Sequence, residues 1–396
     1  MERLIYRFDQ VTINYDRRRI PLSGSEREKR QGIFPYYGAQ GVIDHVDDYI
    51  FDGDYLLIAE DGENLKSKKQ NIAQMASGRF WVNNHAHIVQ GNHLCDTQYL
   101  CYLINSMDLS GFITGSAQPK LSQANMNMIT FALPDIDVQR RIVAFISSFD
   151  DKIAMNERIN DNLEQQVRAV FQEWFVNSAD RVDWETGTFS DLIESTLGGD
   201  WGKEVPTGNN TKMVYCIRGA DIPEVKSGNK GKMPIRYILP KNFDSKRLLP
   251  GDIVVEISGG SPTQSTGRVA AISQSLLDRY STGMVCTNFC RAIKPKPGYS
   301  MFLYYYWQYL YERNVFFSYE NGTTGIKNLD LNGFLTTEEI FLPPIELVDK
   351  FDTLCQTVFD EVFANGLENE KLATLRDSIL PRLMSGEINV SDISTR

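Results

Sequence analysis

The chain has 396 residues, 42% of them hydrophobic and 11% aromatic, which is enough for two or three domains with substantial cores. Its formal net charge of −10 argues against a uniformly basic, nucleic-acid-binding surface. Neither a signal peptide nor a membrane span is expected: the first seven residues lack an apolar stretch, and the most apolar window, 301–317, contains Gln308, Glu312 and Arg313.

Residues 1–133 are predicted to form a first strand-rich domain. The pair Gly53-Asp54 precedes the apolar run 55–59, a pattern typical of a turn that leads into a buried strand. A second apolar run covers residues 80–89, and a helix is expected near residues 97–108. Gly, Asp and Asn residues separate these runs, as in domains built from short strands.

Residues 134–178 are predicted to form one long helix, entered through Leu133-Pro134-Asp135-Ile136. Its seam positions recur in alternating steps of four and three, which is the a/d spacing of a coiled coil. About forty residues, or roughly 60 Å, is long for the alternative of an ordinary core helix. The seam consists of Ile142, Ile146, Phe149, Ile153, Asn156, Asn160, Leu163, Val167, Val170 and Trp174.

Residues 179–341 and 342–390 repeat this order, and residues 391–396 form a tail. Strands are expected at 213–218, 253–257, 268–272 and 284–293, and a helix near 299–312. A second long helix then follows Leu342-Pro343-Pro344-Ile345, and Pro381 is expected to kink or end it. Its seam is Phe351, Cys355, Val358, Val362, Asn365, Asn369, Leu372, Arg376, Ile379 and Leu383.

An internal repeat of about 209 residues relates the two halves, and Gly251-Asp252 echoes Gly53-Asp54 upstream of it. The predicted fold class is α+β: two strand-rich domains, each followed by a long helix, with the helices paired as an antiparallel coiled coil with pseudo-two-fold symmetry. Facing seam residues then have numbers that sum to 525, so Asn156 faces Asn369 and Asn160 faces Asn365. A buried seam asparagine costs stability but fixes register and partner.

The negative charge is concentrated in the predicted helices. Residues 134–180 carry five Lys and Arg against nine Asp and Glu, and residues 342–396 carry five against ten. The two globular regions are close to neutral, with 13 against 15 and 18 against 17. Only the globular regions are therefore expected to approach phosphate groups.

No catalytic, cofactor or metal site is predicted. The sequence contains no GxxxxGK[ST] phosphate loop and no GxGxxG after a predicted strand, and its one Pro-Pro pair, Pro343-Pro344, starts a helix. The six cysteines lack disulfide or CxxC spacing, which favours a reduced, cytoplasmic interior. His85, His87 and His93 have no Cys or carboxylate cluster to complete a metal site, so they are interpreted as ordinary strand and loop residues.

The duplicated Gly-Asp turn, the two Leu-Pro-x-Ile helix entries and the paired seams resemble the specificity subunit of type I restriction-modification systems over essentially the whole chain. The resemblance implies that each globular part is a target-recognition domain for one half of a bipartite double-stranded DNA site, while the helices set the spacing. It also implies two methyltransferase subunits and, in the full complex, restriction subunits as partners. The first helix entry has Val138-Gln139 and the second Leu347-Val348, where the family often has Glu-Gln.

Basic side chains are the candidate DNA contacts, because phosphates require cations and base edges require Arg or polar groups. A scaffold that pairs two protein-binding heads without DNA is the alternative function. The aromatic run 304–307 is interpreted as core packing rather than a base-stacking platform. The DNA-binding candidates are Arg17, Arg18, Arg19, Lys29, Arg30, Lys66, Lys68, Lys69, Lys226, Lys230, Lys232, Lys241, Lys246 and Arg247.

Overall fold

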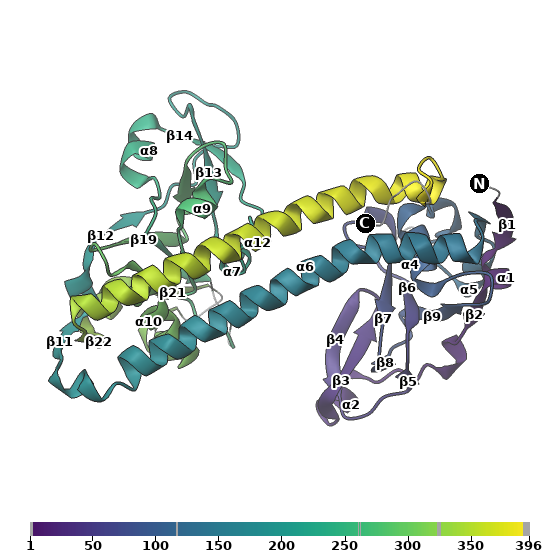
Figure 1. Cartoon of the computed structure of the whole chain (residues 1–396), viewed down its shortest axis with the longest axis horizontal. Coiled ribbons are helices and arrows are strands. Elements are labelled where there is room, and N and C mark those ends of the chain that lie inside the picture. The colour runs from purple at the N-terminus through teal and green to yellow at the C-terminus, as the bar shows by residue number, and fades with distance from the viewer. Residues whose placement is uncertain (1–2, 116–117, 260, 262, 323–325, 391–396) are drawn as a thin grey trace. The chain divides into compact units, whose positions relative to one another are not determined.

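The computed structural model describes residues 3–115, 118–259, 261, 263–322 and 326–390. They fall into two compact units, one within residues 1–151 and 373–396 and the other within residues 152–372 (Figure 1). The long helices α6 (Ile136–Phe171) and α12 (Ile345–Ser385) contribute residues to both units. None of the described helices is long and apolar enough to span a membrane.

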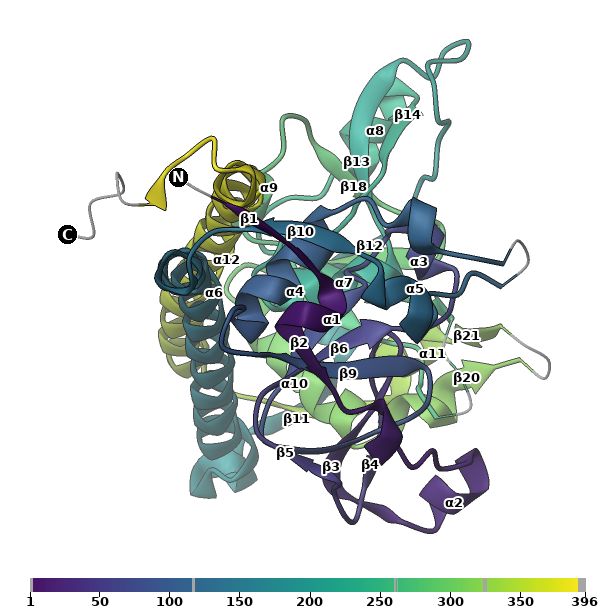
Figure 2. The same cartoon turned by 90° about the vertical axis from the view of Figure 1, so that its right-hand side faces the viewer.

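The first unit is built around a four-stranded sheet with the order β2-β9-β6-β7. Its central strand β6 has the sequence YLLIA and is buried at every position, so it can pack on both faces. Helix α4 contacts this sheet, and β1 pairs with β10 beside it (Figure 2). The elements are β1 (Leu4–Arg7), α1 (Phe8–Val11), β2 (Thr12–Asn14), β6 (Tyr55–Ala59), α3 (Asn64–Ser67), β7 (Ala73–Ala76), β9 (Ala86–Gly91), α4 (Thr97–Ser106), α5 (Gln123–Asn127) and β10 (Thr130–Leu133).

A second sheet of the first unit has the order β4-β3-β8-β5. Phe51 and Phe80 of this sheet cluster with residues of β6, β7 and β9 from the first sheet, and Trp81 forms a small cluster with Tyr36 and Val46. Strands β3 and β8 are parallel, whereas the other pairs are antiparallel. The elements are the 3-10 turn η1 (Asp16–Arg18), α2 (Gly24–Glu28), β3 (Gln31–Gly38), β4 (Gly41–Val46), β5 (Phe51–Asp52) and β8 (Arg79–Val82).

The second unit repeats this arrangement. Its larger sheet has the order β12-β19-β15-β17, and its smaller sheet, β14-β13-β18, again contains a parallel pair, β13 with β18. Helix α10 packs on β17. The strands of these sheets are β12 (Ile193–Gly198), β13 (Lys212–Ile217), β14 (Ile235–Ile238), β15 (Ile253–Glu256), β17 (Val269–Ala271), β18 (Met284–Cys286) and β19 (Cys290–Pro295).

The remaining elements of the second unit complete its helical layer and edges. Strand β11 pairs with β22, as β1 does with β10 in the first unit, and β21 pairs with both β16 and β20. They are β11 (Glu185–Thr188), α7 (Ile222–Lys226), α8 (Pro240–Lys246), β16 (Ser258–Gly259), α9 (Gln274–Leu277), α10 (Ser300–Glu312), β20 (Glu320–Asn321), β21 (Lys327–Leu329), α11 (Leu331–Thr337) and β22 (Glu339–Leu342).

Most predicted elements occur where the sequence places them, and the fold is α+β with a long helix after each strand-rich domain. The apolar runs 80–89 and 284–293, however, are each two strands in different sheets. In the first run, Asn83 accepts a hydrogen bond from the backbone N–H of His85 (2.8 Å), which turns the chain between β8 and β9. Pro381 does not end α12, which continues to Ser385. The compact units cut through the long helices, so the domain boundaries at 133, 178, 341 and 390 stay predictions.

Candidate nucleic-acid interface and helix seam

The helices pair through asparagines in the second unit. Asn156 donates to Asn369 (2.9 Å) and Asn365 donates to Asn160 (2.9 Å), which makes the pairing antiparallel with facing residue numbers that sum to 525. Trp174 lies against Phe351 with the same sum and a ring separation of 6.4 Å. All four asparagines are less than one-tenth exposed, so each amide replaces water with a partner from the other helix.

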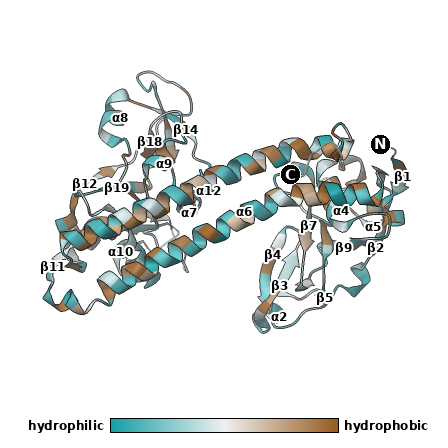
Figure 3. Ribbon diagram, in the orientation of Figure 1, coloured by the Kyte–Doolittle hydropathy of each residue, from teal (hydrophilic) through white to brown (hydrophobic). Residues whose placement is uncertain are grey.

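In the first unit the helix ends pack into the domain core. Ile142, Ile146 and Leu383 are buried in one apolar cluster, and Ile379 packs against it. Arg376, the charged seam position, forms an ion pair with Asp150 rather than stacking on an aromatic ring. Figure 3 shows the resulting alternation of hydrophobic and hydrophilic residues along α6 and α12.

The basic side chains of segment 16–30 divide into structural and exposed groups. Arg18 donates to the Ile50 carbonyl (2.8 Å) and lies over the Phe51 ring, at 4.7 Å from its centroid. Arg30 lies over Trp81 and pairs with Asp47. Arg19 forms an ion pair with Glu60 (2.7 Å), so its charge is compensated inside the domain.

Two cations of this segment remain available to a ligand. Arg17 and Lys29 are exposed, and no ion pair or side-chain hydrogen bond involves either of them in the described part of the chain. Arg17 lies in η1, and Lys29 is the C-cap residue of α2, which contacts the β4-β3-β8-β5 sheet. This sheet also exposes apolar side chains, above all Ile33, which is 81% exposed.

The lysines of the 64–69 loop are all exposed but differ in their contacts. Lys66 donates to the Gly115 carbonyl (2.9 Å). Lys68 adopts a left-handed backbone (φ 48°), donates to the Met107 carbonyl and pairs with Asp108. Lys69 has no such contact among the described residues. A phosphate would therefore meet Lys69 without displacing an existing partner.

The predicted basic residues of the second unit also separate by environment. Burial lowers the pKa of Lys226, and the nearby Arg168 lowers it further, because Lys226 lines a cavity beside α6 with Asn160 and Glu164. Lys230 lies over the Tyr280 ring, and Lys246 donates to the Gly199 carbonyl (2.9 Å). The side chains that are exposed and unpaired among the described residues are Lys232, Lys241 and Arg247.

Two cation–aromatic pairs of the second unit were not singled out in the sequence. Arg236 stacks 3.7 Å over the Trp201 ring and pairs with Glu204, and Lys212 lies over Phe243. They join α8 and the 199–211 segment to the smaller sheet. Because each pair joins residues far apart in sequence, no local pattern could have identified it. The aromatic run 304–307, by contrast, is buried in the core as expected.

The titratable groups have structural roles. Burial raises the pKa of the Cys95 thiol and of the Cys101 thiol to about 12, and all six cysteines are free and buried. Thiols in such surroundings are poor nucleophiles. Glu256 pairs with Arg268 at 2.7 Å, and Asp252 with Lys294 at 2.5 Å. Among the described residues, no group of three or more His, Cys, Asp or Glu side chains is arranged so that it could hold a metal ion.

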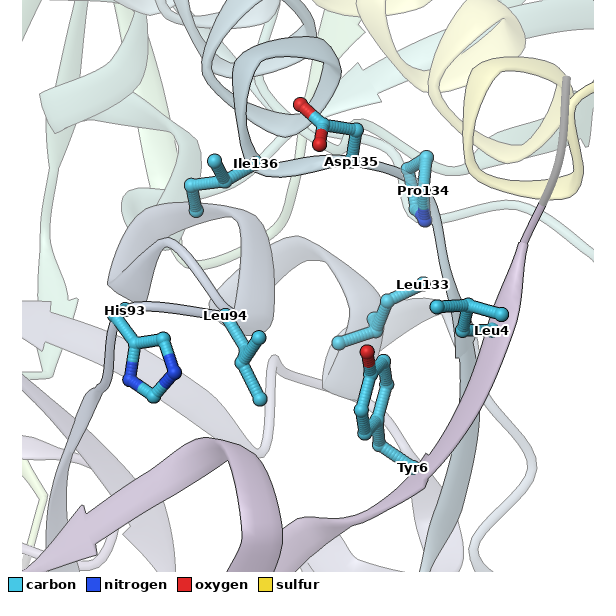
Figure 4. Close-up of a pocket in the computed structure, with 8 residues that line it drawn as sticks. All are labelled: Leu4, Tyr6, His93, Leu94, Leu133, Pro134, Asp135 and Ile136. Carbon is cyan, nitrogen blue, oxygen red and sulfur yellow. The ribbon is translucent and has the colours of Figure 1, made fainter.

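A cavity of about 250 Å³ lies at the entry to α6 in the first unit (Figure 4). Tyr6 from β1 and the Leu133-Pro134 turn form one side of it, and His93 and Leu94 form the other. Its lining is mixed and carries only one carboxylate, that of Asp135. The cavity thus belongs to the helix-entry motif rather than to a reactive centre.

Comparison with known proteins identifies a family and several relatives that this chain resembles. The family model for the type I restriction modification DNA specificity domain matches residues 11–165 and 181–375, one match in each half. A type I restriction enzyme specificity subunit of Haemophilus influenzae is 29% identical over 263 residues, which cover 63% of this chain and 64% of that protein. The MjaIX specificity subunit of Methanocaldococcus jannaschii is 21% identical over 75% of this chain and 70% of its own length.

A solved structure has the same fold. The type I restriction-modification S subunit from M. genitalium aligns over 97% of this chain and 96% of its own, with a TM-score of 0.57 and 11% sequence identity. The family model covers most of the chain, and it matches twice, as the repeated sheets do. The chain therefore belongs to the family of type I restriction-modification specificity subunits.

Proposed function

We propose that this chain directs a type I restriction-modification complex to DNA, with each globular unit recognising one half of a bipartite double-stranded site. The observation that carries the proposal is the repetition of one two-sheet architecture, including its parallel pair, in both units. Two copies of one recognition domain are suited to a DNA site in two parts. The helices, whose register is fixed by paired asparagines, are suited to keep a fixed distance between the two half-sites.

In this proposal the chain is non-catalytic and cytoplasmic, and methyl transfer is performed by two docked methyltransferase subunits. Restriction subunits join them in the full complex. The helices carry most of the chain's excess negative charge, so their acidic faces would contact basic patches on the methyltransferase rather than DNA.

The principal experiment is methylation mapping of the source genome with and without the gene for this chain. We expect a bipartite motif whose methylation requires the chain. The chain with its methyltransferase should then shift a duplex that carries this motif, with strong salt dependence. A pairing scaffold for two protein heads would give neither result.

The exposed, unpaired cations should contribute to binding without contributing to folding. Changing Arg17, Lys29 and Lys69 together to Ala should weaken binding to all sequences and lower the slope of log affinity against log salt by about 2.7, at roughly 0.9 per phosphate contact. The melting temperature should not change. The matched control is Arg19→Ala, which should lower the melting temperature because it leaves Glu60 and Asp16 without their guanidinium. An unchanged salt slope would remove these residues from the interface.

Partner docking should depend on the exposed acidic residues of α6. Reversing the charge of Asp151, Glu157 and Asp161, all exposed, should weaken assembly with the methyltransferase at low salt by about tenfold and less at high salt. Asp150 is left unchanged because it pairs with Arg376. Assembly measured by analytical ultracentrifugation that is unaffected at any salt concentration would exclude an electrostatic contact there.

Helix length should set the preferred distance between half-sites. Adding one helical turn to both helices, about 5.4 Å, should lengthen the spacer of the methylated motif by roughly one to two base pairs at 3.4 Å each. Sequencing of methylated DNA measures the spacer directly. A spacer of unchanged length would show that the helices do not act as a ruler.

A further inference from the structure

A buried histidine of the first unit has two hydrogen-bond acceptors. Nδ1 of His87 lies 2.6 Å from Asp16 Oδ2, and its Nε2 lies 2.8 Å from the backbone carbonyl oxygen of Leu121. The ring is 1% exposed, so water cannot substitute for either partner. A carbonyl oxygen only accepts hydrogen bonds, so Nε2 must carry a hydrogen.

The Nδ1 atom must carry a hydrogen as well, because Asp16 is held as a carboxylate. Its Oδ1 accepts the backbone N–H of Ile88 (2.8 Å), and Arg19 lies 3.6 Å from its Oδ2. Burial raises the pKa of Asp16, whereas the hydrogen bond and the charge of His87 lower it most, and the N–H of Ile88 and the charge of Arg19 lower it further, so this pKa is lowered overall. An imidazole with a bare Nδ1 would place a lone pair against that carboxylate.

The ring lies within a cluster of charged side chains. Glu60, at the end of β6, lies 3.9 Å from Nδ1 and itself pairs with Arg19 at 2.7 Å and Lys120 at 3.2 Å. The cluster thus holds two carboxylates, a guanidinium and an ammonium, so a protonated His87 gives a net charge of +1. His85 forms a separate, more exposed pair with Asp61.

The two acceptors of His87 lie in or beside segments that carry exposed cations. Asp16 begins η1, which contains Arg17 and Arg18. Leu121 donates its N–H to the carbonyl of Glu60 (2.8 Å), and Gly62 donates to the Pro119 carbonyl (3.1 Å), which holds the 119–121 segment against the start of the lysine loop. One imidazole ring therefore links η1 to the 119–121 segment, which in turn contacts the start of the 64–69 loop.

We propose that His87 is held as a doubly protonated imidazolium that positions the two basic segments of the first unit, and that DNA recognition by this unit alone is consequently sensitive to pH. The pH dependence rests on the proposed function, whereas the protonation state does not. Loss of the Nδ1 proton opposes lone pairs at 2.6 Å, and loss of the Nε2 proton opposes them at 2.8 Å, so the ring must move away from the 16–19 segment or from the 119–121 segment.

The second unit lacks this arrangement. His87 pairs with Ile58 across β9 and β6, and the corresponding position of β19, opposite Glu256, is Cys290. There Glu256 pairs with Arg268, which does not titrate in the neutral range. The pH effect should therefore be confined to one half-site of the DNA target.

Nitrogen NMR of the full chain with labelled histidines tests the protonation state. The signal that is absent in His87→Gln identifies His87. In the unchanged chain at about pH 7.5, where an unperturbed imidazole is mostly neutral, this signal should show two protonated ring nitrogens. The signals of the exposed His45 and His93 serve as internal references. In Asp16→Asn, the His87 signal should shift to the neutral pattern. A neutral His87 in the unchanged chain would overturn the proposal.

DNA binding tests the positioning role. On a duplex that carries the mapped motif, His87→Gln should weaken binding on the order of tenfold near pH 6.5, the equivalent of one charge-assisted hydrogen bond. The affinity of the unchanged chain should fall more steeply than that of His87→Gln as pH rises from about 6 to about 9. His45→Gln is the matched control and should follow the unchanged chain. Equal pH profiles for His87→Gln and the unchanged chain would overturn the positioning role, whereas absence of any binding would count against the proposed function and leave the NMR result to decide the protonation state.

Discussion

Replacing Gly366 with alanine should destabilise the second unit by about 2–3 kcal/mol, although alanine is the better helix former by roughly 1 kcal/mol. A Cβ at residue 366 would lie 1.9 Å from the carbonyl oxygen of Gly228 and 2.6 Å from its carbonyl carbon. Backbone atoms cannot rotate away as a flexible side chain can, so the 226–231 segment and α12 must move apart.

Several contacts keep the 226–231 segment from giving way. Arg279 donates to the Gly228 carbonyl at 2.5 Å, and Asn160 donates to the carbonyl of Ser227 at 3.3 Å. Gly228 itself has a φ of +80°, and a side chain there would lie 2.3 Å from the Val362 carbonyl oxygen. The two glycines therefore allow the second domain to contact the helix backbone directly.

Thermal unfolding and hydrogen exchange would measure the effect. Gly366→Ala should lower the melting temperature of the second unit and increase exchange of the amides in 222–231. Gly24→Ala is the matched control, because nothing lies within 4 Å of the added Cβ and the residue is also helical. A stabilising effect of Gly366→Ala would show that the close contact between Gly228 and Gly366 does not persist in solution.

Replacing one asparagine of the seam should cost more than replacing a facing pair. Asn156→Leu leaves the buried amide of Asn369 without its partner, at a cost of about 1–3 kcal/mol, and Asn369→Leu does the same to Asn156. The double variant places leucine against leucine and should recover most of that loss. The coupling free energy from a double-mutant cycle should therefore be about 1–3 kcal/mol in the direction that favours the pair.

The control for this cycle is Asn162→Leu, on the exposed face of the same helix, which should change the free energy of unfolding by less than about 0.5 kcal/mol. Asn156 also forms hydrogen bonds with Lys152 and Glu368. Both of these side chains are about half exposed, so water should replace the hydrogen bonds that they lose in Asn156→Leu. Additive single effects, with no coupling, would mean that the two asparagines do not act as a pair.

The sequence was sufficient for features that depend on local or periodic patterns. Helix α4 begins and ends close to the predicted 97–108 range, and α10 close to 299–312. The 4-3 seam spacing also predicted which asparagines face each other, since a constant residue sum follows from antiparallel geometry. The family resemblance rested on these same repeated patterns.

Only the tertiary structure decided which predicted side chains are available to a ligand. Arg17 and Arg19 are two residues apart, yet Arg19 is consumed by Glu60, from a strand end 41 residues away, and Arg17 is not. The surroundings of three other residues also depended on the tertiary structure: Lys226 lies beside α6, Gly366 lies against Gly228, and His87 lies between Asp16 and Leu121. Each depends on contacts between residues that are distant in the chain, and the free energy of such a contact is set by burial and geometry, which composition and spacing do not encode.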